Sequence, residues 1–118
     1  MNLIDLVEEV EIWSESKGLH KAESSKQFLK VTEEVGEVAA ALARNDKEAL
    51  RDGIGDVVVT LIILAQQNGM TLDECLSCAY DEIKGRTGKM IDGVFVKSSD
   101  IKSVEGCYET FQTRTQND

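Results

Sequence analysis

The chain has no proline, a single histidine and few aromatic residues. Its three cysteines are an odd number, and the one C-x-x-C pair, Cys75 and Cys78, lacks the further ligands that a zinc site needs. His20 is the only histidine, so histidines cannot provide a second pair of zinc ligands. We therefore interpret the cysteines as ordinary buried or half-exposed thiols rather than as a metal or redox centre.

Basic residues are also scarce, and no long apolar run is present. The chain carries 13 Lys and Arg against 22 Asp and Glu, a net charge of −9. This balance argues against a nucleic-acid-binding protein, and no basic amphipathic stretch is present for anionic membranes. The first residues, "MNLIDLVEEVEIW", carry acids where a signal peptide would be basic, and the longest apolar run is too short to span a bilayer. We expect a cytoplasmic protein.

Long stretches of helical periodicity predict an all-α protein, a four-helix bundle within one domain over residues 1–97. Because so small a domain buries proportionally little surface, we expect it to self-associate as a homodimer or homotetramer. Asp92-Gly93 lies between two short apolar runs and predicts a type I′ hairpin, followed by a polar tail over 98–118.

The helices are expected at about 3–17, 24–44, 47–68 and 72–84, with His20 in a loop. Asp46 can cap the third helix and Gly69 stops it, and Thr71 with Glu74 forms a capping box that opens the fourth.

The second predicted helix, "KVTEEVGEVAAALA", carries three carboxylates close together. Glu33 and Glu37 are four residues apart, and Glu34 and Glu37 are three apart, so they lie on neighbouring turns of one face. Only Lys30, one turn earlier, is placed to pair with them. A solvated helix face is the plain explanation of this pattern, and a cation site is the other.

Two aspartates of the third helix favour the cation site. A short turn joins the second and third helices, which should therefore pack antiparallel. Asp52 and Asp56 then lie at the height of the three glutamates, and Gly53 and Gly55 would let the backbones approach. Five converging carboxylates without thiol or imidazole would suit Mg²⁺, with Mn²⁺ as an alternative.

The segments "EEVGE", "IGDVVVTL" and "AYDEIKGRTGKMIDGVFVK" together resemble the MazG-like nucleotide pyrophosphohydrolases, in particular small phage-type members, over about residues 3–97. The resemblance implies a helical bundle that forms dimers or tetramers. It also implies Mg²⁺-dependent hydrolysis of nucleoside triphosphates to the monophosphate and pyrophosphate. The E-E-x-x-E glutamates of the family match Glu33, Glu34 and Glu37, and its closing aspartate matches Asp56.

The chain departs from the family pattern at two positions. The glutamate of the family's E-x-x-D motif falls on Gly53, which leaves Asp52 as the natural substitute. Asp81 stands where relatives often have asparagine, three residues before the lysine that matches Lys84. The first departure puts in question the role of Asp52 and the number of ions bound.

The remaining candidates concern catalysis and substrate. Glu34 or Glu37 could accept the proton of the attacking water. Lys84, Arg86 and Lys89 would contact phosphates or, more simply, stabilise a helix C-terminus. Trp13 would stack on a base or belong to the core. The substrate-binding candidates are Lys30, Asp81, Lys84, Arg86, Lys89 and Trp13.

Two other functions are compatible with the same residues. A dUTPase or dCTPase of the same superfamily would differ only in base choice. A non-catalytic helical oligomer with a degenerate site is the second, because Gly53 replaces a family ligand.

Overall fold

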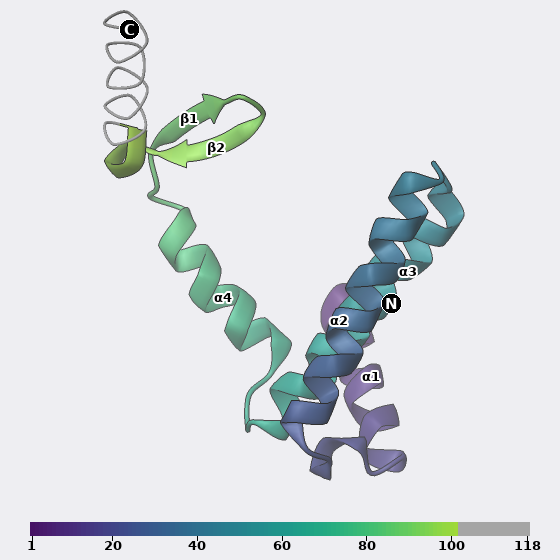
Figure 1. Ribbon diagram of the computed structural model, residues 1–118. Coiled ribbons are helices and arrows are strands. Elements are labelled where there is room, and N and C mark those ends of the chain that lie inside the picture. The colour runs from purple at the N-terminus through teal and green to yellow at the C-terminus, as the bar shows by residue number, and fades with distance from the viewer. Residues whose placement is uncertain (102–118) are drawn as a thin grey trace, which may run out of the picture. The chain divides into compact units, whose positions relative to one another are not determined.

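The computed structural model describes residues 1–101 and contains four long helices and a two-stranded hairpin, as the sequence predicts (Figure 1). It divides into two compact units, Met1–Cys78 and a second beginning at Ala79, which we call the helical unit and the hairpin unit. A short 3₁₀ helix stands where we expected a loop around His20. The elements are α1 Leu3–Ser16, η1 Leu19–Lys21, α2 Ser24–Ala43, α3 Lys47–Gln67, α4 Leu72–Ile83, β1 Gly88–Ile91 and β2 Val94–Lys97.

Local side chains account for the helix boundaries. The Asp46 carboxylate accepts a hydrogen bond from the Ala49 backbone N–H at 3.1 Å, which caps α3 as predicted. Gly69 follows the C-terminal cap of α3 with φ of 71°, a conformation that glycine adopts without strain. The Thr71 hydroxyl accepts from the Glu74 N–H at 3.3 Å and opens α4, also as predicted.

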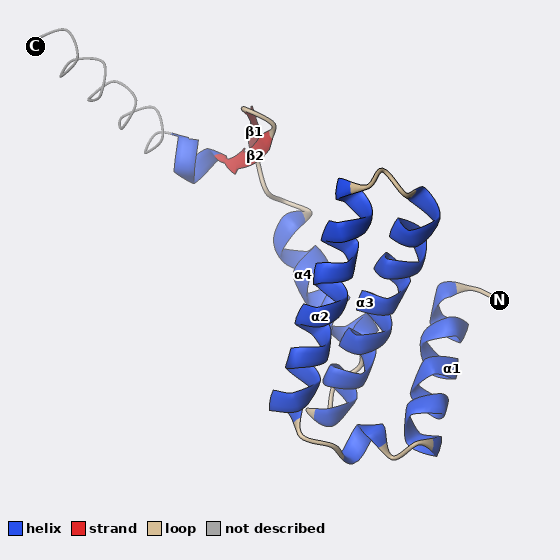
Figure 2. Cartoon of the chain, turned by 45° about the vertical axis from the view of Figure 1, so that its right-hand side comes forward, coloured by secondary structure: helices blue, strands red, loops and turns tan. Residues whose placement is uncertain are grey.

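The core of the helical unit lies on α3. Helices α2 and α3 run antiparallel, side by side, and α1 and η1 pack against α3 (Figure 2). The short connection after Ala43 brings α3 back along α2, which is the arrangement expected of a short helix–helix turn. The buried apolar side chains are Val7, Val31, Ala41, Ile62, Ile63 and Ala65.

The two glycines of α3 differ in their surroundings. Gly53 is buried, and a Cβ added there would lie 3.1 Å from Val38 Cγ2 on α2. Gly55 has no atom within 4 Å of such a Cβ. The prediction that glycine lets the two backbones approach is therefore confirmed at Gly53 and wrong at Gly55.

Only part of the apolar stripe of α2 is covered. Val31 is buried, whereas Phe28, Val35 and Leu42 are 50–59% exposed. These three residues are seven positions apart and so fall on one line along the helix. The helical unit thus presents an apolar line on α2 in addition to the side it packs against α3.

The hairpin unit is a β1–β2 ladder in which Gly88 pairs with Lys97 and Ile91 with Val94. Asp92 and Gly93 have φ of 51° and 79°, the positive values that the predicted type I′ turn needs at both positions. Residues 98–101 are helical, where we expected a polar tail without regular structure. The rest of that prediction lies outside the described residues. No helix within residues 1–101 combines the length and apolarity that crossing a membrane requires.

Candidate functional site

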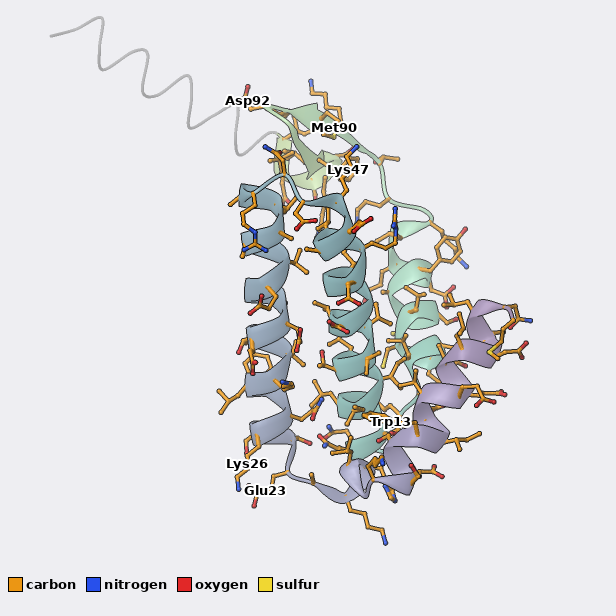
Figure 3. The ribbon with its side chains drawn as sticks, turned by 90° about the vertical axis from the view of Figure 1, so that its right-hand side faces the viewer. Trp13, Glu23, Lys26, Lys47, Met90 and Asp92 are labelled. Carbon is orange, nitrogen blue, oxygen red and sulfur yellow. The ribbon has the colours of Figure 1, made fainter. Side chains whose placement is uncertain are left out.

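A cavity of about 440 Å³ opens in the helical unit among α1, η1, α2 and α3. One part of its wall is apolar and includes Trp13, and another part carries charged groups (Figure 3). Its lining residues are Trp13, Leu19, Ala22, Glu23, Lys26, Gln27, Lys30, Glu34, Asp56, Val59, Thr60 and Ile63. Four predicted site residues therefore meet here: Trp13, Lys30, Glu34 and Asp56.

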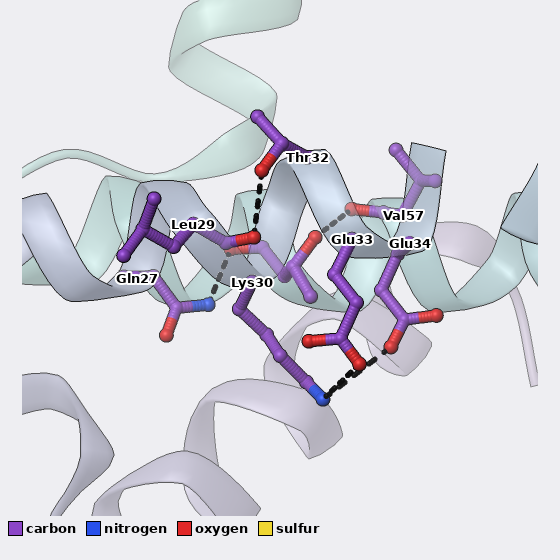
Figure 4. A network of polar contacts seen from close by, with 8 residues as sticks. Gln27, Leu29, Lys30, Thr32, Glu33, Glu34 and Val57 are labelled. Carbon is purple, nitrogen blue, oxygen red and sulfur yellow. Dashed lines mark hydrogen bonds and ion pairs between the residues drawn. The ribbon is translucent and has the colours of Figure 1, made fainter. Parts of the chain in front are cut away.

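Lys30 bridges two glutamates of α2 (Figure 4). Its Nζ lies 3.5 Å from Glu33 Oε1 and 3.6 Å from Glu34 Oε1, so the predicted pairing is confirmed. The Glu34 side chain is only 16% exposed and that of Glu33 is 62% exposed. An ammonium group thus stands between two carboxylates, one of which borders the cavity.

Asp56 reaches the same cavity from α3. It is half-buried and lies at the wall that also carries Glu34, so one carboxylate from each helix borders the same space. This explains why an aspartate leads into an apolar segment: the helix turns that position toward the cavity rather than toward the packed core. A half-buried carboxylate needs a cation or hydrogen-bond donors nearby, and the cavity is where they can reach it.

The five predicted carboxylates do not all converge. Glu33, Glu37 and Asp52 are exposed, and none of them lines the cavity. Across residues 1–101, no three Asp, Glu, His or Cys side chains stand close enough to hold a metal ion as they are placed. Adjacent residues diverge by about 100° around a helix axis, and here the Glu33 side chain is exposed whereas that of Glu34 borders the cavity.

Gly53 has a packing reason to replace the family's glutamate. A Cβ at this buried position would lie 3.1 Å from Val38 Cγ2, so any side chain there would require Val38 to shift by a few tenths of an ångström. Asp52, its exposed neighbour, carries the nearest carboxylate on α3. Glycine in place of the family's glutamate at position 53 is therefore explained by the close contact between α2 and α3.

Polar groups that the sequence analysis missed complete the wall. Gln27 Nε2 donates to the Thr60 carbonyl at 3.0 Å and ties α2 to α3 (Figure 4). The Thr60 hydroxyl donates to the Val57 carbonyl at 2.7 Å. A signal was available, because Glu23, Gln27, Lys30 and Glu34 follow one another at spacings of four and three, the repeat of one helix face.

Trp13 is 48% exposed, so the expectation that it belongs to the core is wrong. It lines the cavity and offers a large flat apolar surface there. Four other substrate candidates, Asp81, Lys84, Arg86 and Lys89, belong to the hairpin unit. There, Lys84 Nζ lies 3.0 Å from Asp81 Oδ1.

Comparison with known proteins identifies the family. A model of the MazG nucleotide pyrophosphohydrolase domain matches residues 23–90, which include Glu34 and Asp56 of the cavity. An uncharacterized 18.2 kDa protein from the rep-hol intergenic region of Haemophilus phage HP1 (strain HP1c1) is 38% identical over 68 residues. That match covers 57% of this chain and 42% of the phage protein, so less than half of the relative is spanned. No solved structure matches. Since the family model covers more than half of its residues, the chain belongs to the MazG nucleotide pyrophosphohydrolase domain family.

Proposed function

We propose that this protein is a metal-dependent nucleoside triphosphate pyrophosphohydrolase that converts (d)NTP to (d)NMP and pyrophosphate. The observation that carries the proposal is the cavity of about 440 Å³ that Glu34 and Asp56 border from two different helices. Its volume falls within the range of small-molecule sites, roughly 300–1,000 Å³. Apolar and charged walls in one cavity suit a ligand with a flat base and an anionic tail.

The proposed cofactor is Mg²⁺, with Mn²⁺ able to replace it. The donor set fits, because carboxylate oxygens are the ligands that these ions prefer. The Lys30 ammonium between Glu33 and Glu34 supports this assignment, since a cation already stands at that place. The proposed ligands are Glu33, Glu34, Glu37, Asp52 and Asp56, of which the exposed ones would join by changing side-chain rotamer. When bound, the ion neutralises phosphate charge and activates water.

In the proposed reaction, water attacks the α-phosphorus and the α–β bridging oxygen leaves with pyrophosphate. Glu34 or Glu37 accepts the proton of the attacking water. Lys30 offsets negative charge beside Glu34, and Trp13 stacks on the base. Lys84, Arg86 and Lys89 contact phosphates, with Asp81 orienting Lys84 through their ion pair.

We further propose that the protein forms a homodimer or homotetramer in the cytoplasm. The line of Phe28, Val35 and Leu42 on α2 supports association, because exposed apolar rows at seven-residue spacing are typical of helix–helix contacts. The thiols of Cys75 and Cys78 are free, as is usual in a reducing compartment.

Gly53 favours one other candidate, a non-catalytic oligomer that retains the fold and has lost a metal ligand. A dUTPase or dCTPase activity would keep the same chemistry and differ in the base accepted. Nucleotide turnover would distinguish the proposed enzyme from a non-catalytic oligomer. The relative rates with different bases would distinguish it from a dUTPase or dCTPase.

The test is a panel of nucleoside triphosphates with Mg²⁺ and with Mn²⁺, resolving monophosphate, diphosphate, pyrophosphate and orthophosphate. We expect monophosphate plus pyrophosphate, abolished by EDTA. Asp56→Asn should lower kcat by ~100-fold or more while the helical circular dichroism is kept, because losing a metal ligand costs more than losing an outer-shell partner. The matched control is Asp92→Asn in the hairpin turn, which should keep its activity since asparagine tolerates positive φ. A protein that turns over no nucleotide with either metal is not a pyrophosphohydrolase.

A further inference from the structure

The cavity among α1, η1, α2 and α3 has two chemically different ends. Glu34 and Asp56 supply carboxylates at one end. Gln27 lies seven residues before Glu34 on α2, roughly 10 Å away along the helix axis. Trp13 belongs to the last turn of α1, which the short η1 connects to the start of α2, so it lies toward the Gln27 end (Figure 3). An aromatic ring and an uncharged amide thus border the part of the cavity that lies away from the carboxylates.

We propose that Gln27 is a specificity-determining residue that accepts a hydrogen bond from the base of the nucleotide. The substrate class that fits this acceptor is a nucleoside triphosphate whose base carries an exocyclic amino group, as cytosine and adenine do. The assignment of the ligand as a nucleotide rests on the proposed function. The preference for an amino group narrows the choice of base, which the reaction itself leaves open.

A hydrogen bond between two helices fixes the orientation of the Gln27 amide. Its Nε2 donates to the Thr60 carbonyl of α3 at 3.0 Å. A carbonyl only accepts, so an amide turned the other way would set two acceptors against each other. The amide oxygen Oε1 is therefore directed away from Thr60 (Figure 4). Within residues 1–101, Oε1 has no hydrogen-bond partner, and the side chain borders the cavity.

Two other glutamines show how an amide with a purely structural role is placed in this fold. Gln66 and Gln67 on α3 also donate from Nε2 to backbone carbonyls, those of Glu11 and Leu19, at 3.2 and 2.9 Å. Their Oε1 atoms are buried, and neither side chain lines the cavity. Gln27 Oε1 likewise has no partner, but it is not buried. A ligand in the cavity can therefore reach it.

The neighbouring polar groups are less suited to recognise a base. Glu23 and Lys26 also line the cavity, but their side chains are 70% and 80% exposed and are paired with each other at 4.0 Å. Thr60 is buried, and its hydroxyl already donates to the Val57 carbonyl. Gln27 is half-buried and held in place by its bond to α3, so it offers an oriented acceptor.

The chemistry of the bases converts this acceptor into a preference. Cytosine and adenine carry amino groups that donate hydrogen bonds. Uracil and hypoxanthine carry a carbonyl oxygen at the same ring position, and that oxygen would face Gln27 Oε1 as a second acceptor. A site that hydrogen-bonds one group discriminates against the analogue that lacks it, because a polar atom of the site is then left unpaired. The Gln27 acceptor therefore predicts a preference for dCTP over dUTP and for ATP over ITP.

The first experiment compares these two pairs of substrates, which differ by an amino group or a carbonyl at one ring position. We expect kcat/KM with Mg²⁺ to favour the amino member of each pair by ~10-fold, about what one hydrogen bond contributes. Gln27→Leu should lose that factor with dCTP and ATP and change little with dUTP and ITP. Gln27→Met keeps the length of the side chain and should give the same result if Gln27→Leu folds poorly.

A structural role for Gln27 predicts a different outcome. Loss of the bond to Thr60 alone would lower stability and reduce the turnover of all four nucleotides by the same factor. Gln66→Leu is the matched control, because it removes a comparable bond between helices outside the cavity and should leave both ratios unchanged. Ratios that stay unchanged in Gln27→Leu and in Gln27→Met overturn the inference.

Binding of the products separates the base preference from the proposed reaction. Calorimetry with dCMP and with dUMP needs no turnover, and we expect dCMP to bind ~10-fold more tightly to the original chain and equally to Gln27→Met. If dCMP is preferred and no triphosphate is hydrolysed, the proposed reaction is wrong and the base site stands. If triphosphates are hydrolysed without preference for an amino group, the reaction stands and the role of Gln27 is wrong. If nothing binds and nothing is hydrolysed, both are wrong.

Discussion

The helical unit and the hairpin unit are stabilised in different ways and carry opposite kinds of chemistry. Residues 1–78 contain seven Lys and Arg against fifteen Asp and Glu, and they enclose a core on α3. Residues 79–101 contain four of each sign, and none of these residues is buried. The candidate metal ligands therefore lie in the unit with a buried core, and the candidate phosphate contacts Lys84, Arg86 and Lys89 lie within residues 79–101, where no side chain is buried.

This difference determines which substitutions each unit tolerates. In the helical unit, packing between α2 and α3 holds the carboxylates of the cavity in place. In the hairpin unit, a two-stranded ladder has little core of its own, so its turn and its cross-strand contacts must specify it. We therefore expect single substitutions to disturb one unit while the other keeps its structure.

The largest expected effect is that of Gly88→Ala in β1. A Cβ at this position would collide with the Val96 carbonyl and the Phe95 ring, and a backbone carbonyl cannot move aside. We expect the cross-strand NOEs of the hairpin to disappear while the amide shifts of α2 and α3 stay unchanged. Gly85→Ala is the control, because no atom lies within 4 Å of its added Cβ. Loss of the α2 and α3 shifts would show that the two units depend on each other.

Within α3, Gly53→Ala and Gly55→Ala form a matched pair. The first presses on Val38, which offsets the gain in helix propensity, and the second meets open space and keeps that gain of roughly 1 kcal/mol. We expect Gly53→Ala to be less stable than Gly55→Ala by about 1–2 kcal/mol in urea unfolding. Equal stabilities would mean that Val38 can shift at little cost and that the close contact at Gly53 does not penalise an added Cβ.

Removing the cap of α3 should have a somewhat smaller effect. Asp46→Ala deletes the hydrogen bond to the Ala49 N–H and should lower the free energy of unfolding by ~1 kcal/mol. Asp46→Asn keeps a capping oxygen and should lose much less. Because this cap lies at the start of α3 and does not line the cavity, nucleotide turnover at a temperature where both variants are folded should be unaffected.

The smallest effect concerns Glu11 on α1. Burial, together with nearby Asp73, Glu8 and Glu15, raises the pKa of this carboxyl above its ordinary value. A folded-state pKa above the unfolded value means that ionisation of Glu11 destabilises the fold. The free energy of unfolding therefore falls as pH rises from the unfolded pKa through the folded pKa. Glu11→Gln should therefore raise the melting temperature at pH 7, and the gain should vanish below about pH 4. Glu9→Gln on the same helix is the control, and an equal gain there would contradict this explanation.

The sequence predicted the local features well because short-range chemistry decides them. Asp46 and Thr71 cap helices wherever they precede a helical pattern, and Asp92-Gly93 adopts a positive-φ turn between two apolar runs. The pairing of Lys30 with Glu33 and Glu34 likewise follows from spacing along one helix. The 3₁₀ helix at η1 had no comparable signal.

Features that join two helices were harder to predict. Spacing placed Glu37 and Asp52 at the height of Asp56, yet both are exposed and only Glu34 joins Asp56 at the cavity. Height along an axis does not fix rotation about it, and rotation depends on how α2 packs on α3. Gly53 illustrates the same point, since its role as a contact with Val38 is visible only when both helices are present.

By itself, the sequence determined the four helices, their ends, the hairpin turn and the family, because each depends on residues that are neighbours in the chain. The tertiary structure alone decided which carboxylates share a cavity, that Phe28, Val35 and Leu42 remain exposed, and that the Thr87 and Ser98 hydroxyls meet across the hairpin. The physical reason is that these depend on the rotation of packed helices and the register of paired strands. Both are set by close packing and hydrogen bonds between segments distant in sequence.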